Sequence, residues 1–238
     1  MSPVLSNRAG LKSLLRQVVL LPPLPQNGNV DHKTHWNSAY ETKGDEVSWF
    51  EGEPTQSLRL IEQFAPARHS LLDVGSGASW LLVRLAERGW SDLNALDVSS
   101  TALALLAERL GGHADVVTMV LADIRTFVAH RSYVTWHDRA VLHFLNRDDD
   151  RIAYAETVAA SLQPGGVAII GGFSPDGPTH CSGLEVRQST SKEIASLFGE
   201  RFTLLNAEID THITPQGNAQ SFSWTVLRRV ETPRTSHC

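Results

Sequence analysis

The stretch "LLDVGSGASW", residues Leu71 to Trp80, decides the fold. Its opening residues are apolar apart from Asp73, as expected of a short buried strand. Gly75 and Gly77 then predict a tight turn, because glycine adopts backbone angles that other residues avoid. A helical pattern follows and ends at Gly89. A strand, a glycine turn and a helix in this order predict a ligand-binding turn with the helix N-terminus facing the ligand.

Strand and helix patterns alternate along the rest of the chain. We expect further strands over 92–99, 115–123, 133–138 and 167–173, and helices over 100–110, 148–162 and 190–199. This alternation predicts a parallel sheet with helices on both faces. The β patterns over 202–210 and 221–230 are separated only by a turn signal, so these two strands should pair antiparallel.

Composition excludes several classes of protein. The chain has 238 residues, of which 42% are hydrophobic and 20% charged, as in ordinary globular proteins. A net charge of −5 gives no electrostatic reason to expect a nucleic-acid partner. No apolar run is long enough to cross a membrane. The two cysteines, Cys181 and Cys238, form neither a disulfide framework nor a cysteine-rich metal site, and we expect no metal and a reducing, cytoplasmic location.

The N-terminal part of the chain is set apart from the rest. Residues 1–30 are basic, and Leu11, Leu14, Leu15, Val18 and Val19 recur at helical spacing. Such a segment could be a mitochondrial presequence, a flexible leader or a docking helix. We therefore divide the chain into a leader or flexible segment (1–30), an N-terminal lid segment (31–54), one ligand-binding domain (55–230) and a tail (231–238).

Acidic residues end three consecutive strands of the predicted sheet. Asp73 precedes the glycine turn, Asp97 closes the second strand and Asp123 closes the third. A carboxylate at the Asp97 position can accept both hydroxyls of a ribose, and one at the Asp123 position can read an adenine edge. A dinucleotide is disfavoured because Trp80 stands where the fingerprint G-x-G-x-x-G needs its last glycine. The pattern predicts a nucleoside-containing ligand without a pyrophosphate.

The segment "LLDVGSGAS", with Asp97, Asp123 and "LQPGG" before a strand, resembles the class I S-adenosylmethionine-dependent methyltransferases. The motifs span about residues 70 to 173, and Ser79 replaces the last glycine of the family's first motif. The resemblance implies a Rossmann-like, doubly wound, mostly parallel seven-stranded sheet whose last strand is antiparallel. It also implies S-adenosyl-L-methionine as the cofactor and a transferase activity.

By this resemblance, different residues of the motifs would bind different parts of the cofactor. Asp73, Gly75 and Gly77 would lie at the methionine end, and Asp97 would bind the ribose. Asp123 would bind the adenine amino group, with Ile124 packing on the ring. The resemblance adds Ser76 and Val98 to the expected contacts of the cofactor.

The stretch Trp136–Leu145 follows the fourth strand, where the methyl group and the acceptor meet in this family. His137, Asp138 and Arg139 are the candidate catalytic residues, with Asp138 able to orient a nucleophile or accept its proton. The alternatives are a local Asp138–Arg139 pair and a structural His137. Methyl transfer is an in-line displacement with a neutral leaving group, so alignment and water exclusion can suffice without a base.

Aromatic residues mark the N-terminal lid segment. Trp36 and Tyr40 are four residues apart and share one helical face, and Trp49 follows a loop at Gly44. They either pack on the core or form a lid with an aromatic ring near the sulfonium. The pattern "HWNxxY…SWFEGEPxxSLRLI" resembles a group of bacterial small-molecule methyltransferases and, less closely, the elongation factor 1A lysine methyltransferases.

We therefore expect an enzyme that methylates a small molecule. A protein acceptor, a non-catalytic binding module with this fold and an NAD-dependent oxidoreductase are the alternatives. The acceptor itself does not follow from the sequence.

Overall fold

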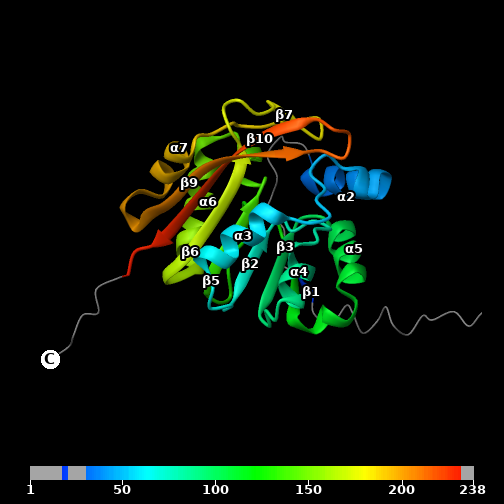
Figure 1. The fold of residues 1–238 in the computed structure, drawn as a ribbon, viewed down its shortest axis with the longest axis horizontal. Helices are drawn as coiled ribbons and strands as arrows, with labels where there is room; N and C mark the ends of the chain where they lie inside the picture. The colour runs from blue at the N-terminus through cyan, green and yellow to red at the C-terminus, as the bar shows by residue number, and fades with distance from the viewer. Residues whose placement is uncertain (1–17, 21–30, 232–238) are drawn as a thin grey trace, which may run out of the picture.

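The computed structural model describes residues 18–20 and 31–231, whose centre is an eight-stranded sheet in the order β1-β4-β3-β2-β5-β6-β10-β9 (Figure 1). Neighbouring strands pair parallel except at β10, which runs antiparallel to both β6 and β9. The expected Rossmann-like sheet with an antiparallel last strand is confirmed. Its strands are β1 (Val18–Leu20), β2 (Leu71–Val74), β3 (Leu93–Asp97), β4 (Val117–Leu121), β5 (Tyr133–Arg139), β6 (Leu162–Phe173), β9 (Phe202–Ile213) and β10 (Ala219–Arg229).

Two apolar cores lie on opposite faces of this sheet. Successive residues of a strand point to opposite faces, so Leu71 joins one core and Leu72 the other. The first core contains side chains of α3 (Thr55–Phe64), α4 (Leu81–Glu87) and α5 (Ser100–Leu110). The second contains side chains of α6 (Asp148–Ser161) and α7 (Ser191–Phe198). This double burial explains why the central strands read as continuous apolar runs.

Local sequence signals set the helix boundaries. Ser99 caps α5, as expected, because its hydroxyl accepts the backbone N–H of Ala102 at 3.1 Å. Gly111 ends the same helix with a positive φ of 50°. Thr190 and Glu193 form a reciprocal capping box at the start of α7.

The structure corrects the expected elements in three places. Val18 and Val19, which have helical spacing with the preceding leucines, lie in β1 and pair parallel with β4. The rest of the expected leader lies outside the described residues. The strand expected over 167–173 begins at Leu162, because the glycine-proline stretch forms a register shift against β5 instead of a loop. The loop after β6 contains a two-stranded hairpin of β7 (His180–Cys181) and β8 (Leu184–Glu185).

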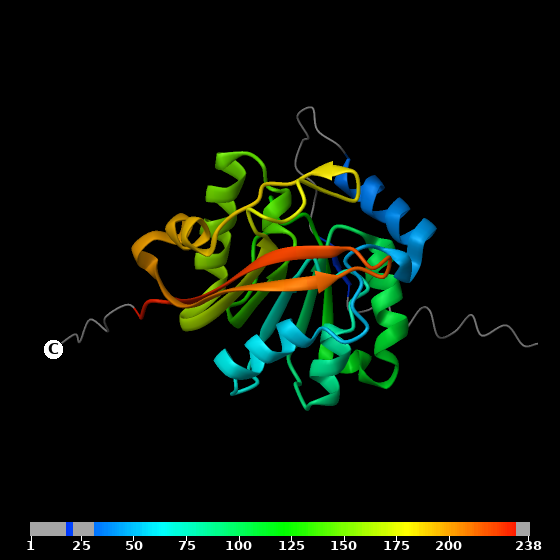
Figure 2. The same cartoon turned by 45° about the horizontal axis from the view of Figure 1, so that its top comes forward.

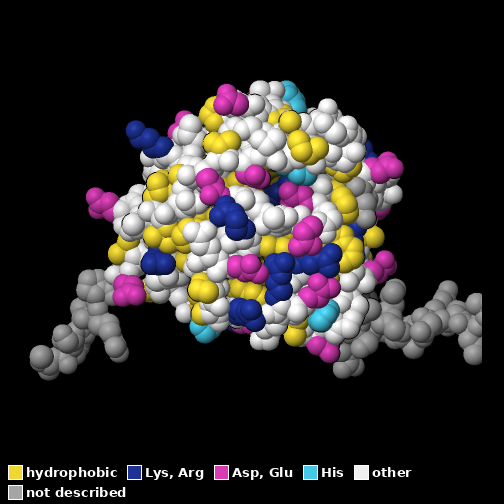
Figure 3. Space-filling model, in the orientation of Figure 1, with side chains coloured by type: hydrophobic (Ala, Val, Ile, Leu, Met, Phe, Trp, Pro, Cys, Tyr) yellow, Lys and Arg dark blue, Asp and Glu magenta, His cyan; other side chains and the backbone are white. Residues whose placement is uncertain are grey.

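The face that carries α3 and α4 has acidic and basic side chains interspersed (Figure 3). Arg84 contacts Glu53 at 2.8 Å and Arg88 contacts Glu62 at 3.1 Å, so these charges are paired rather than gathered by sign. Within the described ranges, no helix is long and apolar enough to cross a bilayer.

Candidate active site

A cavity of about 480 Å³ opens at the carboxyl ends of β2, β3, β4 and β5. This is the edge at which open α/β sheets bind ligands. The helix α2 (His32–Lys43) and the β7–β8 hairpin lie side by side over this edge (Figure 2). The predicted residues that line the cavity are Trp36, Tyr40, Trp49, Gly75, Asp97, Val98, Asp123, Ile124 and Arg139.

The backbone conformation of the turn and its close neighbours require glycine at both positions. Gly75 and Gly77 both have positive φ values, of 63° and 55°. A Cβ atom at Gly75 would overlap the side chain of Val141, and one at Gly77 would overlap the hydroxyl of Tyr40. The turn can therefore approach both the loop after β5 and helix α2 only because it lacks side chains here.

Asp97 ends β3 as a buried carboxylate on the wall of the cavity. Its two oxygens accept the backbone N–H groups of Gly77 and Ser99, each at 2.8 Å. Burial raises the pKa of Asp97 to about 6, although these hydrogen bonds act in the opposite direction. The residue joins the glycine turn to the start of α5, and it can still accept hydroxyl donors from a ligand because each carboxylate oxygen has two acceptor sites.

Asp123 follows β4, lines the same cavity and is half-buried. The Arg125 guanidinium Nε lies 3.0 Å from each of its oxygens. Burial alone would raise the pKa of Asp123, but the hydrogen bonds and charge of Arg125 outweigh it and hold the pKa below its ordinary value. The neighbouring Ile124 is buried and adds an apolar surface to this end of the cavity.

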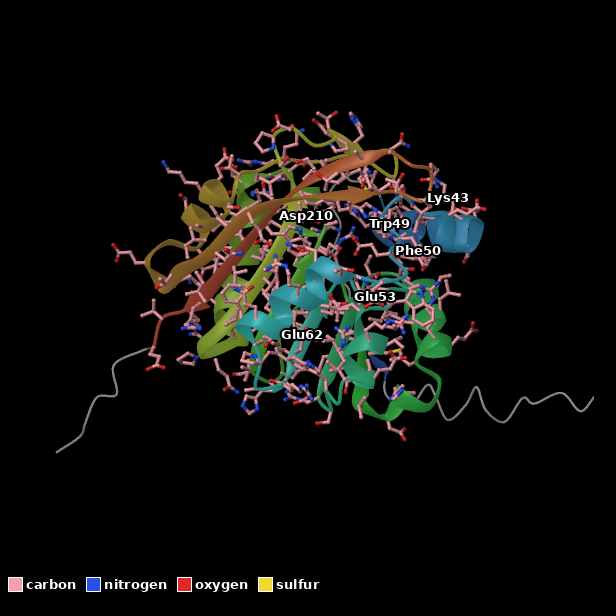
Figure 4. All side chains as sticks on the ribbon, viewed as in Figure 1. Lys43, Trp49, Phe50, Glu53, Glu62 and Asp210 are labelled. Atoms are coloured by element: carbon pink, nitrogen blue, oxygen red, sulfur yellow. The ribbon has the colours of Figure 1, made fainter. Side chains whose placement is uncertain are left out.

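Aromatic rings of α2 meet rings from two other segments on the cavity wall. The ring of Trp36 packs edge-on against Trp49, with centroids 5.4 Å apart, and against Phe144, with centroids 5.1 Å apart. The indole N–H of Trp49 donates to the hydroxyl of Tyr40 at 3.1 Å. Figure 4 labels Trp49 and Phe50 on the segment that joins α2 to α3. The aromatic residues predicted for the lid segment thus lie together, and Phe144 from η4 (Leu142–Phe144) was not predicted.

Polar contacts attach α2 to the body of the protein. The hydroxyl of Ser99 donates to the side-chain oxygen of Asn37 at 2.8 Å, and the backbone N–H of Thr101 lies 3.3 Å from the same atom. The side chain of Asn37 therefore links α2, which forms part of the cavity wall, to the N-terminus of α5. Helix α2 is a folded part of the site and not a separate appendage.

A second hollow, of about 60 Å³, adjoins the first through Tyr40, Trp49, Gly75 and Arg139, which line both. Asp73, predicted at the methionine end, and Ser76, predicted as a cofactor contact, line this smaller hollow and not the larger cavity. The side chain of Asp73 also contacts His137, whose Nδ1 lies 2.7 Å from Asp73 Oδ1.

Asp138, a predicted catalytic residue, lines neither the larger cavity nor the smaller hollow, and its catalytic role stays a prediction. It is fully buried, and its carboxylate accepts the backbone N–H groups of Val141 and Leu142 and the hydroxyl of Tyr154, the last at 2.6 Å. Burial raises the pKa of Asp138 to about 6. The residue holds the turn that follows β5, where Ala140 has a positive φ of 72°.

The other two candidate catalytic residues have different surroundings. His137 is buried and hydrogen-bonded at both ring nitrogens, and it lines the smaller hollow but not the larger cavity, so its catalytic role stays a prediction. Arg139 lines both hollows, but its guanidinium donates to the backbone carbonyl of Trp49 and to Glu51, each at 2.9 Å. Arg139 therefore lines the site, and through these two hydrogen bonds it also anchors the segment that follows α2.

Sequence patterns missed part of the lining. Cys181 and Leu184 close the cavity from the hairpin, and burial raises the pKa of the Cys181 thiol to about 11, so this thiol stays protonated at neutral pH. Ser57 is part of the pattern used for the family resemblance, but no role was predicted for it. Across residues 18–20 and 31–231, no group of three or more His, Cys, Asp or Glu side chains could hold a metal ion.

Comparison with known proteins gives a domain match over the central part of the chain. Residues 71–166 match a family model described as a methyltransferase domain. This range contains the glycine turn and the strand-end acids that line the cavity. A search of curated proteins found no match.

Solved structures show the same fold at low sequence identity. The 1,6-didemethyltoxoflavin N1-methyltransferase of Burkholderia thailandensis, solved with 1,6-didemethyltoxoflavin and S-adenosylhomocysteine, has a TM-score of 0.65 at 18% identity and covers 97% of this chain and 94% of its own. The N-methyltransferase NodS of Bradyrhizobium japonicum, solved with S-adenosylhomocysteine, has a TM-score of 0.64 at 15% identity, with coverages of 83% and 100%.

The sheet order, the glycine turn, the strand-end acids and the matched domain agree. Residues 71–166 thus carry a methyltransferase domain, and the chain has the fold of the class I S-adenosylmethionine-dependent methyltransferases, whose cofactor is S-adenosylmethionine.

Proposed function

We propose that the protein methylates a small molecule bound between α2, η4 and the β7–β8 hairpin. The observation that carries this proposal is the aromatic cluster of Trp36, Trp49 and Phe144 on a cavity wall that the hairpin closes. A site covered by two separate segments and lined by aromatic rings is typical of sites for small ligands.

The chain's own side chains suit the cofactor. Asp97 and Asp123, which line one cavity, offer acceptors for the ribose hydroxyls and the adenine amino group. Ile124 offers an apolar surface for the adenine ring. Asp73 and the buried, unpartnered hydroxyl of Ser76 offer acceptors for an ammonium group in the smaller hollow. The adjoining hollows match a ligand with a nucleoside part and an aminoacyl part.

The acceptor would then lie against the remaining part of the cavity. Trp36, Phe144 and Leu184 come from α2, η4 and the hairpin, so a molecule between them would contact all three segments. A flat or apolar small molecule gains most from such a surface, because aromatic rings bury a large area and prefer edge or offset contacts.

The bound cofactor supplies an electrophilic methyl group on a sulfonium. The protein's part is to align the acceptor with this group and to exclude water. Asp138 is buried away from the cavity and Trp36, Trp49 and Phe144 carry no base, so only His32, Asp150 and Glu185 of the cavity lining could take a proton from an acceptor beside this wall. An acceptor that is nucleophilic in its resting form, such as a neutral amine or ring nitrogen, fits this wall. Two structural relatives are named N-methyltransferases, which makes nitrogen the first acceptor atom to test.

The test combines binding with transfer of a labelled methyl group. Calorimetry should detect S-adenosylmethionine and S-adenosylhomocysteine in the wild type, and Asp97→Ala should weaken both by more than tenfold. With tritiated S-adenosylmethionine and a cell extract, we expect the label in small molecules and not in the protein fraction.

Matched variants separate the acceptor wall from the cofactor site. Trp36→Leu should keep S-adenosylhomocysteine affinity within about threefold while slowing label transfer at least tenfold. Val128→Ala, an exposed residue outside the cavity, is the control and should change neither. Label confined to a protein would contradict the proposal in favour of a protein acceptor. Cofactor binding without any transfer would favour a non-catalytic module.

A further inference from the structure

A chain of three buried side chains lies behind the glycine turn. Asp73 Oδ1 is 2.7 Å from His137 Nδ1, and His137 Nε2 is 3.0 Å from Ser57 Oγ. The three residues are 3%, 1% and 1% exposed. They come from β2, β5 and α3, and Asp73 and His137 are direct partners in the parallel pairing of β2 with β5.

The hydrogen-bonding capacity of each group fixes the direction of this chain. An ionised carboxylate only accepts hydrogen bonds, so Nδ1 of His137 must carry the proton and donate to Asp73. In the neutral ring Nε2 then accepts, and the hydroxyl of Ser57 donates to it. Both ring nitrogens are thus paired, and Ser57 fixes the tautomer that Asp73 requires.

This order of residues also occurs in Ser-His-Asp hydrolases. Ser57 borders only the smaller hollow of about 60 Å³, which Asp73 and Ser76 also line. Ser57 does not line the larger cavity, so it cannot act on a substrate bound there. The chain therefore acts on a neighbouring group and not on a substrate of its own.

The polar atoms that this chain of hydrogen bonds leaves without a partner indicate which group it orients. His137 holds Oδ1 of Asp73, which leaves Oδ2 as the carboxylate oxygen that can receive a ligand. Ser76 lines the same hollow, is 3% exposed, and its hydroxyl has no hydrogen-bond partner among the described residues. A carboxylate and an unpaired hydroxyl in a small buried space suit a compact cation with several N–H donors.

We infer that His137, locked by Ser57, is a positioning residue that orients Asp73 so that Oδ2 and Ser76 Oγ receive the ammonium group of the cofactor's methionine tail. This inference rests on the cofactor assigned above. Because the contact is to the tail alone, a ligand without an aminoacyl group should not sense the loss of His137.

The experiment compares two ligands that differ in this tail. Calorimetry on the full chain measures S-adenosylhomocysteine, which has the aminoacyl group, and 5′-methylthioadenosine, which lacks it. His137→Asn keeps an N–H donor near the Nδ1 position, whereas His137→Gln extends its amide to the Nε2 position and loses the donor to Asp73. We expect His137→Gln to weaken S-adenosylhomocysteine at least tenfold and 5′-methylthioadenosine less than twofold. We expect His137→Asn to stay within about threefold of the wild type for both.

Further variants test the two ends of the chain. Ser76→Ala and Asp73→Asn should weaken S-adenosylhomocysteine selectively, as should Ser57→Ala to a smaller degree. Thr135→Val is the matched control, because Thr135 lies two residues before His137 on the same face of β5, is fully buried and has an unpartnered hydroxyl. It should change neither affinity.

Nuclear magnetic resonance gives a readout independent of affinity. Imidazole ¹⁵N shifts of His137 should show a proton on Nδ1, and a proton on Nε2 alone would overturn the inference. Equal weakening of both ligands by His137→Gln, or equal behaviour of the Asn and Gln variants, would also overturn it. A wild type that binds neither ligand would instead refute the cofactor assignment, so the two failures are distinguishable.

Discussion

Gly75→Ala should destabilise the protein through two separable effects. The first is backbone strain, because Gly75 has a φ of 63°, and an L-residue in the left-handed region costs about 1–2 kcal/mol. The second is overlap, because the new Cβ would lie less than 3.0 Å from a methyl group of Val141. Overpacking of this kind costs about 1–3 kcal/mol. The expected loss in the free energy of unfolding is therefore about 2–5 kcal/mol.

Val141 has little freedom to move aside. Its backbone N–H donates to Asp138 at 2.8 Å, and the preceding Ala140 already has a positive φ. Val141→Ala removes the overlapping methyl group and should cost about 1–2 kcal/mol alone, from the buried methyl area lost. In the double variant the overlap disappears. The summed loss of unfolding free energy of the two single variants should therefore exceed the loss of the double variant by about 1–3 kcal/mol.

Gly111→Ala is the matched control. Gly111 has a similar φ of 50°, but no atom lies within 4 Å of the position that its Cβ would take. It should show the strain alone. Urea unfolding of the four variants and the wild type, without ligand, measures all of these terms. If Gly75→Ala cost no more than Gly111→Ala, or if Val141→Ala gave no relief, the steric argument would be refuted.

Three further predictions concern residues at the edge of the site. Burial raises the pKa of Asp97 to about 6 from 3.8, so the folded state binds more protons between these values, and the free energy of unfolding should fall as pH rises through this window. Asp97→Asn should make the pH dependence of stability less steep without abolishing it, because the pKa of Asp138 is raised as well. An unchanged slope would contradict the role of Asp97 in this pH dependence. Asp138→Asn leaves a buried donor unpaired and should lower the unfolding free energy at pH 7 by about 1–3 kcal/mol. The affinity for S-adenosylhomocysteine should stay within a few-fold of the wild type. Unchanged stability with lost turnover would instead support a catalytic role for Asp138. Thr190→Ala removes the capping box of α7 and should cost about 1 kcal/mol in urea unfolding while leaving cofactor affinity unchanged; a large loss of affinity would show that α7 affects the site.

The fold could be predicted because its signals are local. The glycine turn after Leu71–Val74, the cap at Ser99 and the turn at 214–218 each lie within a few residues, and turn chemistry acts over that range. Parallel strands bring their carboxyl ends to one edge, so the sequence alone predicts that Asp97 and Asp123 lie at the same edge, where the cavity opens.

Contacts between distant segments could not be predicted in the same way. His137 bonds Ser57, which lies 80 residues earlier in the chain, and no local pattern specifies that partner. The β7–β8 hairpin and β1 are also too short to give a periodic signal.

The sequence by itself determined the order of the main strands and helices, the glycine turn and the acids at the strand ends. Only the tertiary structure decided the roles of the neighbours His137, Asp138 and Arg139. Successive strand residues point to opposite faces, so His137 meets α3 while Asp138 meets Tyr154 of α6. Arg139, at the end of β5, reaches the cavity wall. Which of three adjacent polar residues faces a ligand depends on what packs on each side of the sheet, and that information is spread over the whole chain.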